Sequence, residues 1–73
     1  MTIGERIRGL REDRDMNQTQ VAELLSTSQT VYSRYERNER LLPTDLLIIL
    51  CKFYKVSADY ILGLSYDYKR PER

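Results

Sequence analysis

Two helix-start signals lie close together in the middle of the chain, and they restrict its fold more than any other feature. Residues 17–20 (NQTQ) form a capping box, in which the first and last side chains bond each other's backbone N–H groups. Ser28 is suited to cap a second helix, and only a tight turn at Ser26-Thr27 separates the two. Residues 17–40 are therefore predicted to form two short helices joined by a turn.

Further helix signals flank this segment on both sides. Thr2 and Glu5 form another capping box at the start of a first helix. A fourth helix is predicted over residues 45–54, and Ser57 is suited to cap a fifth. The predicted fold is all-α: a compact five-helix bundle in which residues 17–40 form a helix-turn-helix.

The size and composition of the chain fit one small globular domain. It has 73 residues, of which 41% are hydrophobic and 32% are charged. We expect a domain over residues 1–64 and a polar tail over residues 65–73. No apolar run is long enough to span a bilayer, and the N-terminus does not have the layout of a signal peptide. The expected location is the cytoplasm, without a membrane partner.

The residues needed for most catalytic chemistry are not present in the sequence. Cys51 is the single cysteine and there is no histidine, so neither a disulfide within the chain nor a zinc site is expected. The sequence also has no glycine-rich phosphate loop and no carboxylate pair beside a nucleophile. We therefore expect no enzyme activity, no metal and no cofactor.

The third predicted helix, at about 29–37, has two distinct faces, because successive residues advance by about 100° around a helix axis. One face is polar and consists of Gln29, Thr30, Ser33, Arg34 and Arg37. The opposite face is mostly apolar and consists of Val31, Tyr32, Tyr35 and Glu36. Such a helix buries one side and presents the other outward.

The polar face has the chemistry of a surface that reads DNA bases. Glutamine can pair at two points with adenine, arginine can do so with guanine, and threonine or serine can bond bases or touch a thymine methyl. These residues lie in the first turns, the part of a recognition helix that enters the major groove. The predicted base contacts are Gln29, Thr30, Ser33 and Arg34. The alternative is an ordinary solvated face, and the net charge of +1 favours neither reading.

Glu36 is the one acidic residue on the buried face. An unpaired buried carboxylate is costly, so it needs a partner. Arg11 lies at the edge of the apolar stripe of the first helix. We therefore predict a structural ion pair between Arg11 and Glu36.

The ordered set of these residues resembles the Cro and phage-repressor (Xre-like) helix-turn-helix family. The resemblance extends from residues 3–8 (IGERIR) through the helix-turn-helix to residues 56–63 (VSADYILG). It implies a lambda-repressor-like domain that binds double-stranded DNA, usually as a homodimer. It also implies phosphate contacts by Gln18, Arg37, Asn38 and Arg40, and it agrees with the Arg11–Glu36 pair. Ser26 and Asn38 stand where this family often has glycine.

The predicted fourth helix is apolar on more than one side. Its core face follows helical spacing and consists of Leu47, Leu50, Cys51 and Tyr54. A second apolar stripe consists of Leu46, Ile49 and Phe53. This stripe is predicted to contact a second copy or a protein partner. The alternative is that the fifth helix and the tail with Tyr66 and Tyr68 cover it.

Two functions follow from these patterns. The leading one is a sequence-specific DNA-binding transcriptional regulator, acting as a homodimeric repressor. The alternative is a protein-interaction module, for example an antitoxin, that docks a partner through the apolar fourth helix. The exposed polar face of the third helix favours the first function, and the double apolar stripe supports the second.

Overall fold

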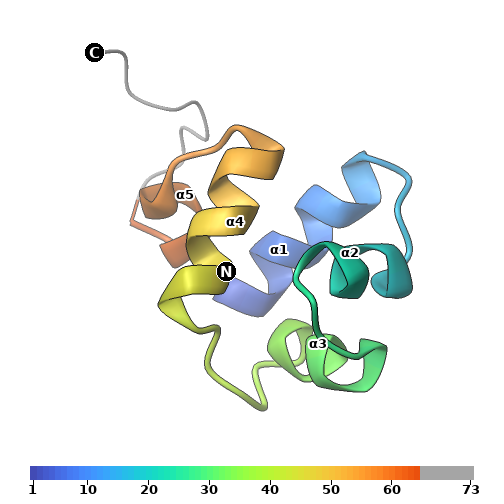
Figure 1. Ribbon diagram of the computed structural model, residues 1–73. Helices are drawn as coiled ribbons and strands as arrows, with labels where there is room; N and C mark the ends of the chain where they lie inside the picture. The colour runs from blue at the N-terminus through green and yellow to red at the C-terminus, as the bar shows by residue number, and fades with distance from the viewer. Residues whose placement is uncertain (65–73) are drawn as a thin grey trace.

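The computed structural model describes residues 1–64, which form five helices (Figure 1). In chain order these are α1 (Ile3–Asp13), α2 (Gln18–Leu24), α3 (Gln29–Glu36), α4 (Thr44–Tyr54) and α5 (Ala58–Leu62). The predicted all-α, five-helix architecture is confirmed. The expected tail, with Tyr66 and Tyr68, lies outside the described residues.

Side-chain caps set where α1, α2, α3 and α5 begin, as predicted, whereas α4 begins after Pro43 without one. The Thr2 hydroxyl accepts from the Glu5 N–H at 3.1 Å, and the Glu5 carboxylate accepts from the Thr2 N–H at 2.9 Å. Asn17 and Gln20 make the equivalent pair at the start of α2, with both bonds at 2.8 Å. The Ser28 hydroxyl caps α3 at 3.1 Å. These bonds satisfy N–H groups that have no partner within a helix.

Left-handed residues mark the turns after α2, α3 and α4. Ser26 has a φ of 56°, Asn38 of 60° and Lys55 of 58°. Asparagine tolerates this conformation better than most residues, whereas serine and lysine pay a steric cost that glycine would not. The turn between α2 and α3 therefore keeps its geometry without the glycine that is common there.

Helix α1 lies between two halves of the molecule (Figure 1). It contacts α3 on one side and α5 on the other, while α2 packs on α3 and α4 packs on α5. The Arg6 guanidinium, from α1, lies over the Tyr60 ring of α5 at 4.5 Å. The helix-turn-helix thus packs on one side of α1, and the α4–α5 pair packs on the opposite side.

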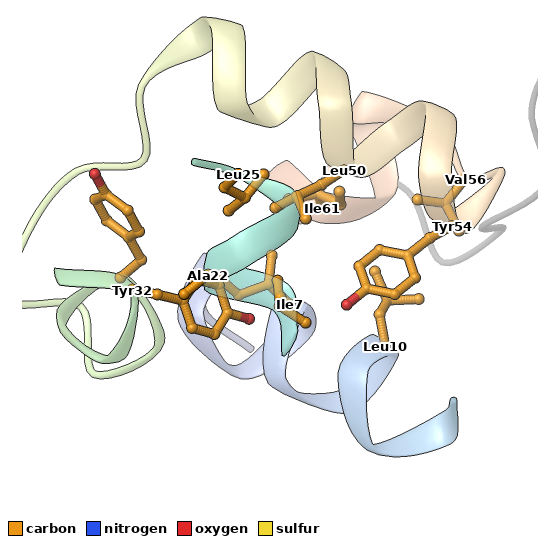
Figure 2. Packing of buried hydrophobic residues seen from close by; sticks show 11 residues of the cluster. Ile7, Leu10, Ala22, Leu25, Tyr32, Leu50, Tyr54, Val56 and Ile61 are labelled. Atoms are coloured by element: carbon orange, nitrogen blue, oxygen red, sulfur yellow. The ribbon is translucent and has the colours of Figure 1, made fainter. Parts of the chain in front are cut away.

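The core lies where α1, α2 and the α4–α5 pair meet (Figure 2). Ile7, Leu50 and Ile61 are completely buried there, and Tyr32 extends the core beneath α3. Burying side chains of this size stabilises the fold by roughly 1.5–3 kcal/mol each before entropy is counted. No helix within residues 1–64 combines the length and apolarity that a membrane span requires.

The predicted faces of α4 need one correction. Leu50 and Tyr54 are buried as expected, but Leu46 and Phe53, which were expected on an outer stripe, pack against the core. The guanidinium of Arg14 also lies 5.5 Å from the Phe53 ring centre. The exposed apolar residues of α4 are instead Ile48 and Ile49, at 48% and 36% exposure. Leu46 and Phe53 are thus partly buried, a placement that helical spacing within α4 cannot reveal because it depends on the other helices.

Candidate nucleic-acid interface

Helix α3 lies at the edge of the molecule (Figure 1). Its first turns carry exposed polar side chains. Gln29, Thr30 and Arg34 are exposed, in the arrangement that the sequence predicted. Below them, Tyr32 is completely buried and Tyr35 is 6% exposed. The two tyrosines meet edge to face at 6.4 Å and anchor the inner side of the helix.

Ser33 does not belong to this outward set. Its residue is only 8% exposed, and its hydroxyl donates to the Thr30 carbonyl at 2.8 Å. The position lies at the border of the polar face, beside Tyr32 and Glu36. A short hydroxyl at such a position bonds the preceding turn of its own helix instead of reaching outward. The expectation of an outward-facing Ser33 was therefore wrong.

Gln29 is held by a glutamine from the start of α2. Its Nε2 donates to Gln18 Oε1 at 2.7 Å. The Nε2 of Gln18 donates in turn to Glu36 Oε1 at 3.0 Å. Gln18 is half-buried and bridges the two helices of the helix-turn-helix. The first residue of the candidate recognition helix thus has a defined side-chain position.

The Arg11–Glu36 pair is present and forms the inner end of this network. Arg11 Nε lies 2.7 Å from Glu36 Oε2, and the second guanidinium bond to Oε1 is 3.1 Å. The side chains are 13% and 3% exposed, so the pair is shielded from water. Arg11 also donates to the Met16 carbonyl at 2.9 Å and so fixes the loop before α2.

Burial alone would raise the pKa of Glu36. The hydrogen bonds from Arg11 and Gln18 outweigh it and hold the pKa of this carboxyl below its ordinary value. The carboxylate raises the pKa of Arg11 in return. Glu36 is therefore ionised at neutral pH.

Exposed cations follow α3 in the next loop. Arg37 makes a surface ion pair with Glu39 at 3.1 Å, and both side chains are more than half exposed. Arg40 is exposed as well. Together with Arg34, these residues place three arginines at this edge, of which Arg37 is paired with Glu39.

Asn38, in the same loop, has a structural role that the sequence did not reveal. Its side-chain oxygen Oδ1 accepts from the Gly4 N–H at 3.0 Å, and its Nδ2 donates to the Thr2 hydroxyl at 2.9 Å. The end of α3 is thereby tied to the start of α1. One N–H of the Asn38 amide is left for another acceptor.

Gly4 permits this close approach. A β-carbon at Gly4 would lie 2.2 Å from the Glu36 carbonyl oxygen and 2.8 Å from that of Tyr35. Only a residue without a side chain lets the backbone of α1 meet the last turn of α3. A glycine in the first turn of a helix, where it is unfavourable by propensity, was the sequence signal for this contact.

The helix-turn-helix family profile matches residues 7–61. The chain belongs to this family, in its Cro and phage-repressor-like (Xre-like) branch.

Curated relatives carry the same domain. An uncharacterised HTH-type transcriptional regulator of Bacillus subtilis, YobD, is 40% identical over 86% of this chain and 56% of its own length. The HTH-type transcriptional regulator ImmR of the same organism is 36% identical over 99% of this chain and 57% of its length. The antitoxin PezA of Streptococcus pneumoniae is 34% identical over 84% of this chain and 39% of its length. The chain thus spans little more than half of the first two relatives and less of the third.

A solved structure has the same fold. The P22 c2 repressor protein, crystallised in complex with a synthetic operator, aligns with a TM-score of 0.80 and 29% identity. The alignment covers 89% of this chain and 98% of that one. The fold is therefore that of a lambda-repressor-like helix-turn-helix domain.

Proposed function

We propose that this protein is a sequence-specific DNA-binding transcriptional regulator that acts as a homodimeric repressor. One observation carries the proposal: Gln29, Thr30 and Arg34 are exposed on the first turns of α3, over a buried inner face on which Glu36 is paired with Arg11. The printed descriptions of two relatives as transcriptional regulators, and of a similar fold bound to an operator, support it. Because such a protein must reach DNA, the proposal includes a cytoplasmic location.

The base contacts in this proposal come from Gln29, Thr30 and Arg34. Phosphate contacts come from Gln18, Arg37 and Arg40, with Asn38 contributing its remaining N–H. Gln18 has one amide N–H beyond the one bonded to Glu36, so it can donate to a phosphate while it keeps its bond to Glu36. Occupancy of a promoter by two copies, with their α3 helices about 34 Å apart in successive major grooves, would block transcription.

Selection of binding sites from a random duplex pool tests this function. A near-palindromic site is expected, and its affinity should fall as salt is raised. Gln29→Ala and Arg34→Ala should each weaken binding to the selected site roughly 5- to 100-fold. Arg8→Ala, which removes an exposed cation from α1, should leave it unchanged. Arg40→Ala should reduce the slope of log affinity against log salt by about 1. Failure to select any site would overturn the proposal.

The dimer in this proposal would form on the α4–α5 side. Ile48 and Ile49 are the exposed apolar residues of α4, so they replace Leu46 and Phe53 as the residues for a contact with a second copy. Sedimentation of the wild type and of Ile49→Glu tests the contact. A dimer that dissociates in the variant is expected, and a folded wild-type monomer on DNA would contradict it.

An apolar groove supports protein binding as a second candidate function. It lies between α4 and α5, has a volume of about 330 Å³, and includes Leu47, Ile48, Cys51 and Val56 in its lining. The antitoxin among the relatives makes a protein partner a reasonable alternative. Titration against mixed-sequence DNA at two salt concentrations separates the functions, since a pure interaction module should select no site.

A further inference from the structure

Three hydrogen-bonded side chains connect the buried ion pair to the surface of α3. Glu36 Oε1 accepts from Gln18 Nε2 at 3.0 Å, and Gln18 Oε1 accepts from Gln29 Nε2 at 2.7 Å. Arg11 holds the other side of the Glu36 carboxylate through two further bonds. This series of hydrogen bonds therefore runs from Glu36, whose side chain is 3% exposed, to Gln29, which is open to solvent.

The direction of these bonds is fixed by chemistry. An ionised carboxylate can only accept hydrogen bonds, so Gln18 has to turn its NH₂ group toward Glu36. The Gln18 carbonyl oxygen then faces Gln29, and it too can only accept. Gln29 must therefore turn its own NH₂ group toward Gln18. Each amide would otherwise be free to rotate by 180°, because its two ends are almost the same size.

We propose that Glu36 is a positioning residue for base recognition, which sets the amide orientation of Gln29 through Gln18 and thereby makes Gln29 select adenine. In this orientation Gln29 keeps one N–H donor and its carbonyl acceptor for a ligand. Adenine presents the complementary pair in the major groove, the N7 acceptor and the N6 amino donor. This inference rests on the proposed function, because it concerns the same DNA-binding face.

The opposite orientation would favour a different base. If Gln29 turned its carbonyl oxygen toward Gln18, both N–H groups of its amide would point outward. Two donors match guanine, which presents N7 and O6 as two acceptors. A neutral group at position 36 could accept or donate, so it would permit both orientations. The charge on Glu36, and not only its size, should therefore control base preference.

Base preference at one position of the selected site tests this inference. The position that Gln29 contacts is identified as the one whose preference disappears in Gln29→Ala. At that position the wild type should prefer adenine over guanine about tenfold or more, and Glu36→Gln should reduce this ratio to about threefold or less. Arg11→Lys is the matched control, because it weakens the same ion pair but leaves Glu36 a carboxylate. It should lose stability and keep the adenine preference.

A second variant covers the case in which Glu36→Gln does not fold. Gln18→Met keeps the ion pair and interrupts the hydrogen-bonded chain, so it should lower overall affinity and also relax the adenine preference. An unchanged adenine-to-guanine ratio in the folded variants, or an equal loss in Arg11→Lys, would overturn the inference.

A measurement on the free protein separates this inference from the proposed function. The side-chain NH₂ resonances of Gln18 and Gln29 in ¹⁵N–¹H spectra should be shifted from solvent-exposed values in the wild type and in Arg11→Lys. Both pairs should move toward exposed values in Glu36→Gln. If the wild type selects no DNA site, the proposed function fails while the NH₂ resonances still test the amide orientation. If the resonances do not respond to Glu36→Gln, the inference fails whatever the protein binds.

Discussion

The two sides of α1 are stabilised in different ways. On the α2–α3 side, directional bonds dominate: the Arg11–Glu36 pair, the two glutamines and the Asn38 contacts to the start of α1. On the α4–α5 side, Leu50 and Ile61 are completely buried, and the Arg6 guanidinium lies over the Tyr60 ring. Directional bonds give atoms defined positions, whereas apolar burial stabilises without fixing an orientation. The side with directional bonds is the one that presents the candidate DNA-binding residues.

Removing one member of the buried ion pair is expected to have the largest effect. Arg11→Ala leaves a carboxylate that is 3% exposed without its cation, so it should lower the free energy of unfolding by roughly 3–5 kcal/mol. Arg37→Ala breaks the exposed pair with Glu39 and should change the free energy of unfolding by less than about 1 kcal/mol. Urea unfolding measures both. Equal effects would mean that the buried pair has no special role.

The close approach of α1 to α3 gives the next largest effect. Gly4→Ala places a β-carbon against the Glu36 carbonyl and should lower the free energy of unfolding by roughly 1–3 kcal/mol. Gly9→Ala is a matched control in the same helix, because nothing lies within 4 Å of its added carbon. It should stabilise the protein by roughly 0.5–1 kcal/mol. Thermal unfolding should therefore shift in opposite directions for the two variants.

Acid should destabilise the α2–α3 side of the molecule. The pKa of Glu36 is lower in the folded protein than its ordinary value of 4.5. The unfolded chain therefore takes up this proton first, so the contribution of Glu36 to stability is complete above about pH 4.5 and is lost as the pH falls through the folded value. The free energy of unfolding, measured from pH 6 to pH 3, should fall less steeply in Glu36→Gln.

Alkali should act on the tyrosines. Burial raises the pKa of Tyr54 from 10.0 to about 12 and raises the pKa of Tyr32 as well. The folded state thus favours the neutral phenol. The contribution of Tyr54 to the free energy of unfolding is therefore complete below about pH 10 and is lost as the pH rises toward about 12. Tyr54→Phe should lose stability less steeply over this range. An identical pH profile would contradict the assigned cause.

The smallest effect concerns the turn after α4. Lys55 has φ 58° and ψ 46°, so Lys55→Gly should relieve the cost of a left-handed residue and stabilise the fold by about 1 kcal/mol. Lys52→Gly, inside the same helix, should destabilise it by about the same amount. Calorimetry should show melting temperatures about 4–8 °C above and below the wild type.

Local signals in the sequence were enough to define most of the fold. Helix starts depend on bonds between residues three positions apart, such as Asn17 with Gln20, so they are legible without tertiary contacts. The outward placement of Gln29 and Arg34 follows from helical periodicity alone. The Arg11–Glu36 pair followed from a single rule, that a buried carboxylate needs a cation.

Contacts between distant segments explain what the sequence did not reveal. Ser33 sits at the border of its helix face, where periodicity does not decide between water and the preceding turn. The partial burial of Phe53 depends on the core cluster against which it packs, and the role of Asn38 depends on Thr2 and Gly4.

The sequence by itself determined where the helices begin and which residues of α3 lie on its polar side, because both depend on neighbours within one turn. Tertiary structure alone decided how the helix ends meet and which way the glutamine amides point. Those properties depend on the positions of atoms from residues far apart in the chain, such as Gln18 and Glu36, which only the packed fold brings within hydrogen-bonding distance.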